Sequence, residues 1–390
     1  MIRQPIVVLV GHVDHGKSSI LERIREISIT KGESGGITQS IKSYTVPLTT
    51  IKNVCGNLLE ELKIKLTIPG LLFIDTPGHA AFTNLRKRGG NLADIAILVI
   101  DINEGLKPQT IEALDILKSY KTPFIIALNK IDLIPGWRKQ SDNIIQNIDS
   151  QSENVKQKID NLLYELLGKL YEHDIKTERF DRVDDYTKQI AIVPCSAKTN
   201  EGLSELLMIL TGLAQRYLES TLKIHVKGPG KATVLEVKED KKLGTTIDVI
   251  VYDGTLKVND EIVVGTINEP IVTKIRSLFE IEKNKLITVK SVNAASGVKI
   301  FAPKLKDVIA GMPLMVVNKN LSNIKKQIQK EIEEVIIETD KEGIVIKADA
   351  LGSLEALISL LKEHDIKIKR ASIGPVTKKD ISDATAEKDP

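Results

Sequence analysis

Residues near the N-terminus carry the pattern most able to do chemistry. Gly11 to Ser18 has the spacing G-x4-G-K-S, between an apolar run and a helical pattern. Glycines at this spacing let backbone N–H groups turn inward around phosphate oxygens. Lys17 can reach the terminal phosphates, and Ser18 can offer a hydroxyl to Mg²⁺. The pattern therefore predicts a phosphate-binding loop, but alone it does not separate ATP from GTP. The candidate nucleotide-binding residues here are Val13, Asp14, His15, Gly16, Lys17, Ser18 and Ser19.

A second candidate is the box Asp75-Thr76-Pro77-Gly78-His79, directly after an apolar run. A carboxylate at Asp75 can hold Mg²⁺ through water, and the Gly78 N–H can donate to the terminal phosphate. Taken alone, the box is better explained as an ordinary β-turn.

Two further boxes have the chemistry to select a base. Asp132 can accept hydrogen bonds from N1–H and N2–H₂ of guanine, a donor pair that adenine lacks. Asn129 can bond to N7, and the stem of Lys130 can lie over the ring. In Ser196-Ala197-Lys198 the Ala197 N–H can donate to guanine O6. Each box alone is also a plausible polar loop.

A glycine-rich segment supplies the fifth box, Thr38 within Gly35-Gly36-Ile37-Thr38-Gln39. A threonine hydroxyl here can complete a Mg²⁺ shell only while the third phosphate is present. Residues 29–44 would then be a switch, ordered by GTP and released on hydrolysis. The alternative is a flexible surface loop.

The order of the boxes along the chain favours a single site. Four of them follow short apolar runs, and ligands bind at the carboxyl ends of the strands in open parallel sheets. We therefore predict one Mg²⁺-bound guanine-nucleotide site, and residues 129–132 disfavour an ATP-dependent kinase or motor. The apolar runs are residues 6–10, 71–74, 95–100, 124–128 and 191–193.

The elements around these boxes predict a doubly wound α/β domain over residues 1–220. The Val-, Ile- and Leu-rich runs are typical of strands buried on both faces. Residues 158–171 and 203–218 have helical apolar spacing. Residues 63–68 alternate polar and apolar side chains, which predicts an edge strand.

The pattern changes after residue 220. Short β-branched segments separated by Gly, Asp and Asn predict an antiparallel β-barrel over residues 221–319, with a hairpin turn at Asp253-Gly254. Residues 320–390 predict a linker helix over 320–337. A strand (344–348), a helix (354–361) and a strand (366–368) would then begin a partial α/β domain. Because that domain stops before a complete sheet, we expect a fragment of a longer protein.

Composition excludes several other classes. The chain has 390 residues, of which 55 are basic and 52 acidic, so a net charge of +3 does not by itself predict nucleic-acid binding. Its two cysteines are far apart, which favours a reducing compartment. We see neither a membrane span nor a signal peptide, and expect a cytoplasmic monomer.

The boxes together resemble the translational GTPases, whose second box ends in histidine, as at His79, and whose nucleotide domain precedes a β-barrel. Within them the chain is similar to the family of initiation factor 5B and its bacterial counterpart, initiation factor 2. The segments that carry this closer resemblance are Gly35–Gln39, Ala80–Gly89, Pro108–Ala113, Pro135–Trp137, Arg179–Val183, Leu213–Leu218, Asp349–Leu357 and Ile373–Val376.

This resemblance implies GTP hydrolysis on the ribosome, with Mg²⁺, during subunit joining and initiator-tRNA placement. It implies that His79 orients the attacking water, that Lys17 stabilises charge, and that Val13 and Ile37 form a hydrophobic gate. Mg²⁺ would be held by Ser18, Thr38 and Asp75, and an additional cation by Asp14 and the Gly36 carbonyl.

The partners implied by the family are GTP and GDP, both ribosomal subunits with their RNA, initiation factor 1A and initiator tRNA. A fourth domain holds the tRNA acceptor end in that family, and we expect this chain to end within the third. Two alternatives stay open. One is another translational GTPase, an elongation or selenocysteine-specific factor. The other is a nucleotide-gated binding module with negligible turnover.

Overall fold

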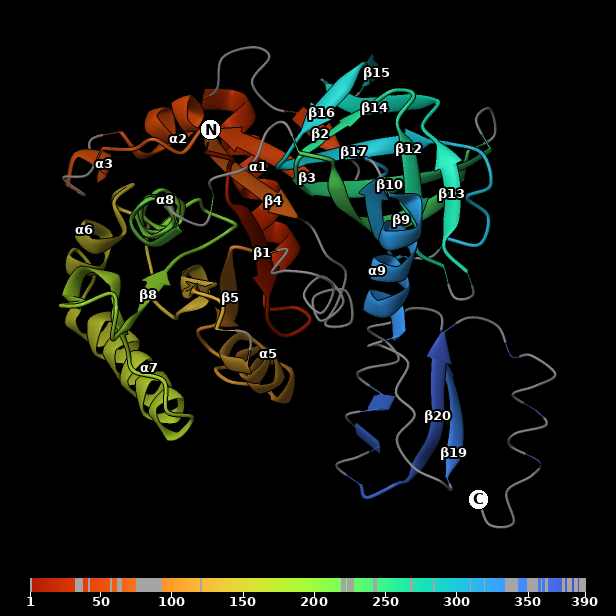
Figure 1. Cartoon of the computed structure of the whole chain (residues 1–390). Helices are drawn as coiled ribbons and strands as arrows, with labels where there is room; N and C mark the ends of the chain where they lie inside the picture. Colours follow the sequence, from red (N-terminus) through yellow and green to blue (C-terminus); the bar gives the residue numbers. More distant parts are fainter. Residues whose placement is uncertain are drawn as a thin grey trace.

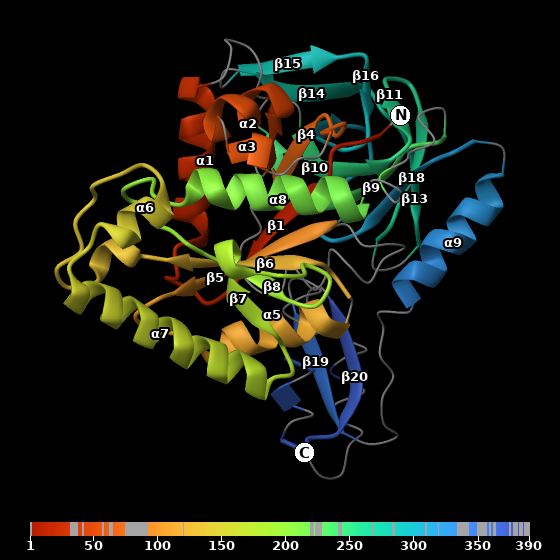
Figure 2. The same ribbon diagram turned by 90° about the vertical axis from the view of Figure 1, so that its left-hand side faces the viewer.

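The computed structural model is shown in Figures 1 and 2. The structure describes residues 2–31, 38–40, 43–56, 58–61, 65–74, 93–119, 121–218, 222, 228–240, 244–266, 269–282, 285–308, 310–318, 320–333, 343–348, 357–358, 360–361, 364–373, 376, 381 and 385.

A mostly parallel sheet lies at the centre of the N-terminal half (Figure 1). Its strand order is β3-β4-β1-β5-β6-β8-β7, with every neighbouring pair parallel except β3 and β4. The Val- and Ile-rich strands are buried along almost their whole length, which confirms the five predicted parallel strands. Their bounds are β1 Ile6–Val10, β3 Ser43–Pro47, β4 Gly70–Ile74, β5 Ile95–Asp101, β6 Phe124–Asn129, β7 Thr177–Arg179 and β8 Ile190–Pro194.

Helices cover this sheet on two sides. Helix α2 contacts α1, α3 and α8, so these helices form one layer. Figures 1 and 2 both place α5 on the other side of the strands from α8, as in a doubly wound fold. The predicted helix 203–218 agrees with α8, and 158–171 lies within α7. The bounds are α1 Lys17–Lys31, α2 Leu48–Cys55, α3 Leu58–Glu61, α5 Pro108–Ser119, η1 Ile131–Leu133, α6 Ile144–Asp149, α7 Glu153–Glu172, η2 Phe180–Arg182 and α8 Leu203–Leu218.

The predicted edge strand over residues 63–68 is wrong in its described part. Residues 65–69 belong to no strand. The backbone N–H groups of Thr67 and Ile68 donate instead to Gln215 Oε1 on α8, at 2.6 and 3.0 Å. The free edge of β4 is taken by β3. A side chain from a distant helix thus satisfies the amides that a strand neighbour would have bonded.

An antiparallel β-barrel follows, as predicted. Its strands pair in the order β13-β12-β18-β9-β10-β17-β14, around a buried core that includes Val249, Ile262 and Leu278. Short strands β11 and β16 pair with each other, and β15 pairs with β14. The bounds are β9 Lys231–Asp240, β10 Gly244–Asp253, β11 Thr255–Lys257, β12 Glu261–Val264, β13 Ile271–Lys274, β14 Ser277–Glu282, β15 Lys285–Val289, β16 Ser291–Asn293, β17 Ser296–Phe301 and β18 Pro313–Val316.

Two features of the barrel differ from expectation. Asp253-Gly254 does not close a hairpin, because β11 pairs with β16 rather than turning back onto β10. The barrel is also joined to the parallel sheet by β2 (Thr38–Ser40), which pairs antiparallel with both β3 and β14. This bridging strand falls in the segment predicted as a switch.

The C-terminal part begins with α9 (Leu321–Glu333) and contains the parallel pair β19 (Ile344–Ala348) and β20 (Ile368–Ile373). Strand 344–348 is confirmed, whereas the last predicted strand begins two residues later, at Ile368. Ile358 and Leu361 pack with Ile346 and Ile368 in a small cluster, as expected for one face of the predicted helix. Among the described residues, none of the helices has the length and apolarity needed to cross a membrane.

Gln215→Ala should destabilise the protein by about 1–3 kcal/mol, because two backbone amides lose their acceptor. Thermal or urea unfolding measures the loss. Gln157→Ala, on an exposed face of α7, is the matched control and should be close to neutral. Equal stability of the two variants would contradict the role given to Gln215.

Candidate nucleotide-binding site

The predicted phosphate-binding loop joins β1 to α1. Asp14 and Gly16 adopt left-handed backbone conformations, with φ of +67° and +93°. Within this turn Val13, Asp14, Ser18 and Ser19 are exposed, whereas His15 is fully buried. The exposed oxygens of Asp14 and Ser18 are the type of donor that Mg²⁺ prefers, so the described residues fit the expected ion.

Lys17 turns back onto the loop. Its Nζ donates to the carbonyl oxygens of Gly11 and His12, at 2.8 and 2.5 Å. Burial of the ammonium lowers the pKa of Lys17, an effect that Asp14 opposes. A cation held at the mouth of a turn of this kind can stabilise phosphate charge.

Asn129, at the end of β6, forms hydrogen bonds with both the phosphate-binding loop and the Ser196–Lys198 box. Its Nδ2 donates to the His15 carbonyl oxygen at 2.9 Å, and its Oδ1 accepts from the Ala197 N–H at 3.1 Å. A Cβ at Gly16 would lie only 2.3 Å from Asn129 Nδ2. The loop therefore needs glycine at position 16 both for backbone conformation and for room.

Asp132 is positioned by the third box. Its Oδ1 accepts from Ser196 Oγ at 2.6 Å, and Ser196 Oγ accepts in turn from the Lys198 N–H at 3.2 Å. Arg23 of α1 holds the same loop through its Nε, which donates to the Ala197 carbonyl oxygen at 3.0 Å. These hydrogen bonds orient the carboxylate of Asp132.

Cys195 links the two base-selecting loops through its backbone. Its N–H donates to the Leu128 carbonyl oxygen at 2.8 Å, and its carbonyl oxygen accepts from the Ile131 N–H at 3.2 Å. The thiol is fully buried, and burial raises its pKa.

Sequence reasoning missed several supporting residues. Asp101, at the end of β5, pairs with Lys130, with 2.8 Å between Oδ2 and Nζ. His15, by contrast, was among the predicted residues; its Nδ1 lies 3.3 Å from the Val99 carbonyl oxygen, and burial lowers the pKa of the ring. Gln109 accepts from the Val13 N–H at 3.2 Å. A signal for Asp101 was present, since it too ends a parallel strand.

The remaining predicted residues are described only in part. Gly36, Ile37, Asp75, Gly78 and His79 fall outside the described residues. Thr38 is described through its backbone, which pairs with Glu282 as part of β2. Val13 is 53% exposed, as a residue at a ligand edge would be. The structure therefore brings together the phosphate loop and both base-selecting boxes.

Comparison with protein families gives matches along most of the chain. Residues 3–216 match the Elongation factor Tu GTP binding domain, and residues 244–315 match Elongation factor Tu domain 2. Residues 317–389 match Translation-initiation factor 2. Fold and family together define a GTP-binding protein of the translation-factor class, with a nucleotide domain followed by a β-barrel.

Relatives identify the branch of that class. The "Probable translation initiation factor IF-2" of Methanopyrus kandleri is 53% identical over the whole chain, which covers 67% of that protein. GDP-bound aIF5B from Aeropyrum pernix superposes with a TM-score of 0.91 at 46% identity, over 98% of this chain and 66% of that one. The chain belongs to the translation initiation factor IF-2 family, and spans about two-thirds of the length of these relatives.

Elongation factor SelB from Methanococcus maripaludis is much less similar. Its TM-score is 0.50 at 20% identity, over 80% of this chain and 55% of that chain, which shows a shared fold alone. The alternative of a selenocysteine-specific factor is therefore not favoured.

Gly16→Ala should weaken GDP binding about tenfold or more, because the new methyl group displaces Asn129 from the loop and strains the backbone. Titration with a fluorescent GDP analogue measures the dissociation constant. Gly168→Ala is the control, since a Cβ at this position of α7 meets nothing within 4 Å. It should leave binding unchanged and stabilise α7 slightly. Unaltered GDP affinity of Gly16→Ala would contradict the proposed packing.

Proposed function

We propose that this chain binds GTP and GDP at the edge formed by Gly11–Ser18, Asn129–Asp132 and Ser196–Lys198, and hydrolyses GTP on the ribosome during initiation. The observation that carries the proposal is the side chain of Asn129, which joins the phosphate loop to the base-selecting loop. Family membership supports the reaction, since GTP hydrolysis is the activity of the class.

Hydrolysis of GTP does not require a covalent intermediate with the protein. Phosphoryl transfer to water depends on positioning and on stabilising charge at the phosphate oxygens. Lys17 and the loop N–H groups stabilise that charge, and His79 orients the water. Ser18, Thr38 and Asp75 would hold Mg²⁺, which would neutralise negative charge on the phosphate oxygens.

The hydrophobic gate and the additional cation site both involve exposed residues of the phosphate loop. Val13 is exposed within the loop. By resemblance to the family, it would form the gate with Ile37 and keep His79 turned away from the phosphates. Asp14 is also exposed, and its carboxylate can hold a further cation together with the Gly36 carbonyl. We propose the ribosome, initiation factor 1A and initiator tRNA as partners, and a cytoplasmic monomer as the working form.

Asp132→Asn should change base selection from guanosine to xanthosine triphosphate, because an amide donates where the carboxylate accepted. Competition between the two nucleotides for a fluorescent GDP analogue measures the preference. Asp142→Asn is the matched control, since the Asp142 side chain is 97% exposed and ion-paired to Lys139. An unchanged guanosine preference in Asp132→Asn would place base selection elsewhere.

His79→Ala should keep GTP affinity and lose most ribosome-stimulated hydrolysis, by about 10²-fold or more, because water is no longer oriented. Single-turnover hydrolysis is measured with the small subunit, the large subunit and the joined particle. His173→Ala, at the end of α7, is the control. Normal stimulated turnover of His79→Ala would remove the catalytic assignment. Absence of turnover in the unaltered chain with every particle would favour a nucleotide-gated binding module.

A further inference from the structure

A buried carboxylate contacts the loop of residues 196–199, which we call the base-selecting loop. Glu201 occupies the turn between β8 and α8, and its side chain is fully buried. Three side chains donate to it, those of Trp137, Asn147 and Thr199. The Trp137 Nε1 lies 3.2 Å from Oε1 and 3.4 Å from Oε2. Burial of a carboxylate costs free energy unless hydrogen-bond donors surround it, and the Glu201 side chain has these three donors.

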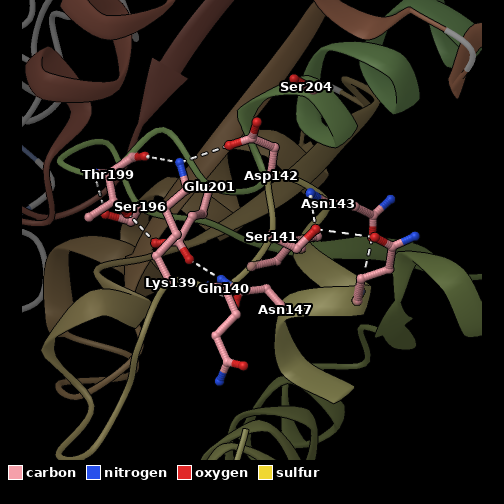
Figure 3. Close-up of polar contacts among 12 residues, drawn as sticks. Lys139, Gln140, Ser141, Asp142, Asn143, Asn147, Ser196, Thr199, Glu201 and Ser204 are labelled. Atoms are coloured by element: carbon pink, nitrogen blue, oxygen red, sulfur yellow. Dashed lines mark hydrogen bonds and ion pairs between the residues drawn. The ribbon is translucent and has the colours of Figure 1, made fainter. Parts of the chain in front are cut away.

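Glu201 holds the loop at two points. Its side chain accepts from Thr199 Oγ1, and its backbone carbonyl oxygen accepts from the Ser196 N–H at 2.9 Å. Gly202 makes this turn possible, because its φ is +73° and a Cβ at this position would lie only 2.1 Å from the Pro194 carbonyl oxygen. Figure 3 shows Glu201 between Ser196, Thr199 and the segment that carries Asn147.

On its other side, Glu201 anchors the segment of residues 137–151, which we call the docking segment. Asn147 of α6 donates to Glu201 Oε1, while its own Oδ1 accepts from the Gln140 N–H at 2.8 Å. Lys139 adds a second link, because its Nζ donates to the Thr199 carbonyl oxygen at 3.2 Å (Figure 3). The docking segment and the base-selecting loop therefore share one buried acceptor.

A second buried carboxylate provides an internal comparison. Glu205, on the first turn of α8, accepts from the Ile144 N–H at 2.9 Å. It thus holds the docking segment as Glu201 does. Glu201, by contrast, accepts from Thr199 Oγ1 and from the Ser196 N–H.

The geometry points to Glu201 as a positioning residue for guanine discrimination, acting through Thr199 and Ser196 on the carboxylate of Asp132. Ser196 Oγ lies 2.6 Å from Asp132 Oδ1, so displacement of the loop turns the carboxylate that faces the base. A misaligned carboxylate weakens its hydrogen bonds to both N1–H and the 2-amino group of guanine. A base without the 2-amino group has only one of these bonds to lose, so its affinity falls less. This inference rests on the proposed nucleotide site and assigns it a specificity determinant.

The test compares GDP with inosine diphosphate, which lacks the 2-amino group. Glu201→Gln keeps the shape but replaces one of the two acceptor oxygens with an amide donor, so the side chain can no longer accept from Trp137, Asn147 and Thr199 together. We expect GDP affinity to fall and the GDP-to-inosine diphosphate preference to fall about tenfold, because inosine diphosphate affinity falls less. Thr199→Val should reproduce this loss, and Thr199→Ser, which keeps the hydroxyl, should restore the preference.

Glu205→Gln is the matched control, since Glu205 is a buried carboxylate on α8 that accepts from the Ile144 N–H of the docking segment. It should lower stability while leaving the preference intact. An equal loss of preference in Glu205→Gln, or an unchanged preference in folded Glu201→Gln and Thr199→Val, would overturn the inference. Absence of GDP binding by the unaltered chain would instead refute the proposed site itself.

Discussion

The hydrogen bonds of the Asn129 side chain are the constraint on which the candidate site depends. This amide lies at the end of a central parallel strand and is almost completely buried. Its Nδ2 donates to the turn after β1, and its Oδ1 accepts from the turn after β8. Since a buried amide without partners costs about 1–3 kcal/mol, both turns are held where the amide is satisfied. The phosphate end and the base end of the site therefore form one rigid unit.

Much of the fold was predictable because its causes are local. Continuous apolar runs such as residues 95–100 can only be buried on both faces, and helical apolar spacing fixed α8 to the residue. The boxes at strand ends were predictable for the same reason, because parallel strands bring their carboxyl ends to one edge. The β-barrel followed from short β-branched segments and their turn residues.

The parts that escaped prediction depend on contacts between distant residues. Gln215 accepts hydrogen bonds from the backbone N–H groups of residues 67 and 68. The local sequence around residues 67 and 68 gives no sign that a side chain of α8 will bind there. Pairing of β2 with β14 likewise joins residues more than two hundred positions apart. Arg23 and Glu201 contact the loops of the site and not the predicted ligand, so their roles are visible only once the chain has folded.

Cys195 gives the base-selecting edge a further property. Its thiol stays protonated under physiological conditions, because burial raises the pKa. Oxidants and alkylating reagents attack the thiolate and need access to sulfur, so this edge is protected from both. Modification at Cys195 can proceed only when the strand end separates from its neighbours. The rate of that modification would therefore report how often the site opens, with a probe that the chain already contains.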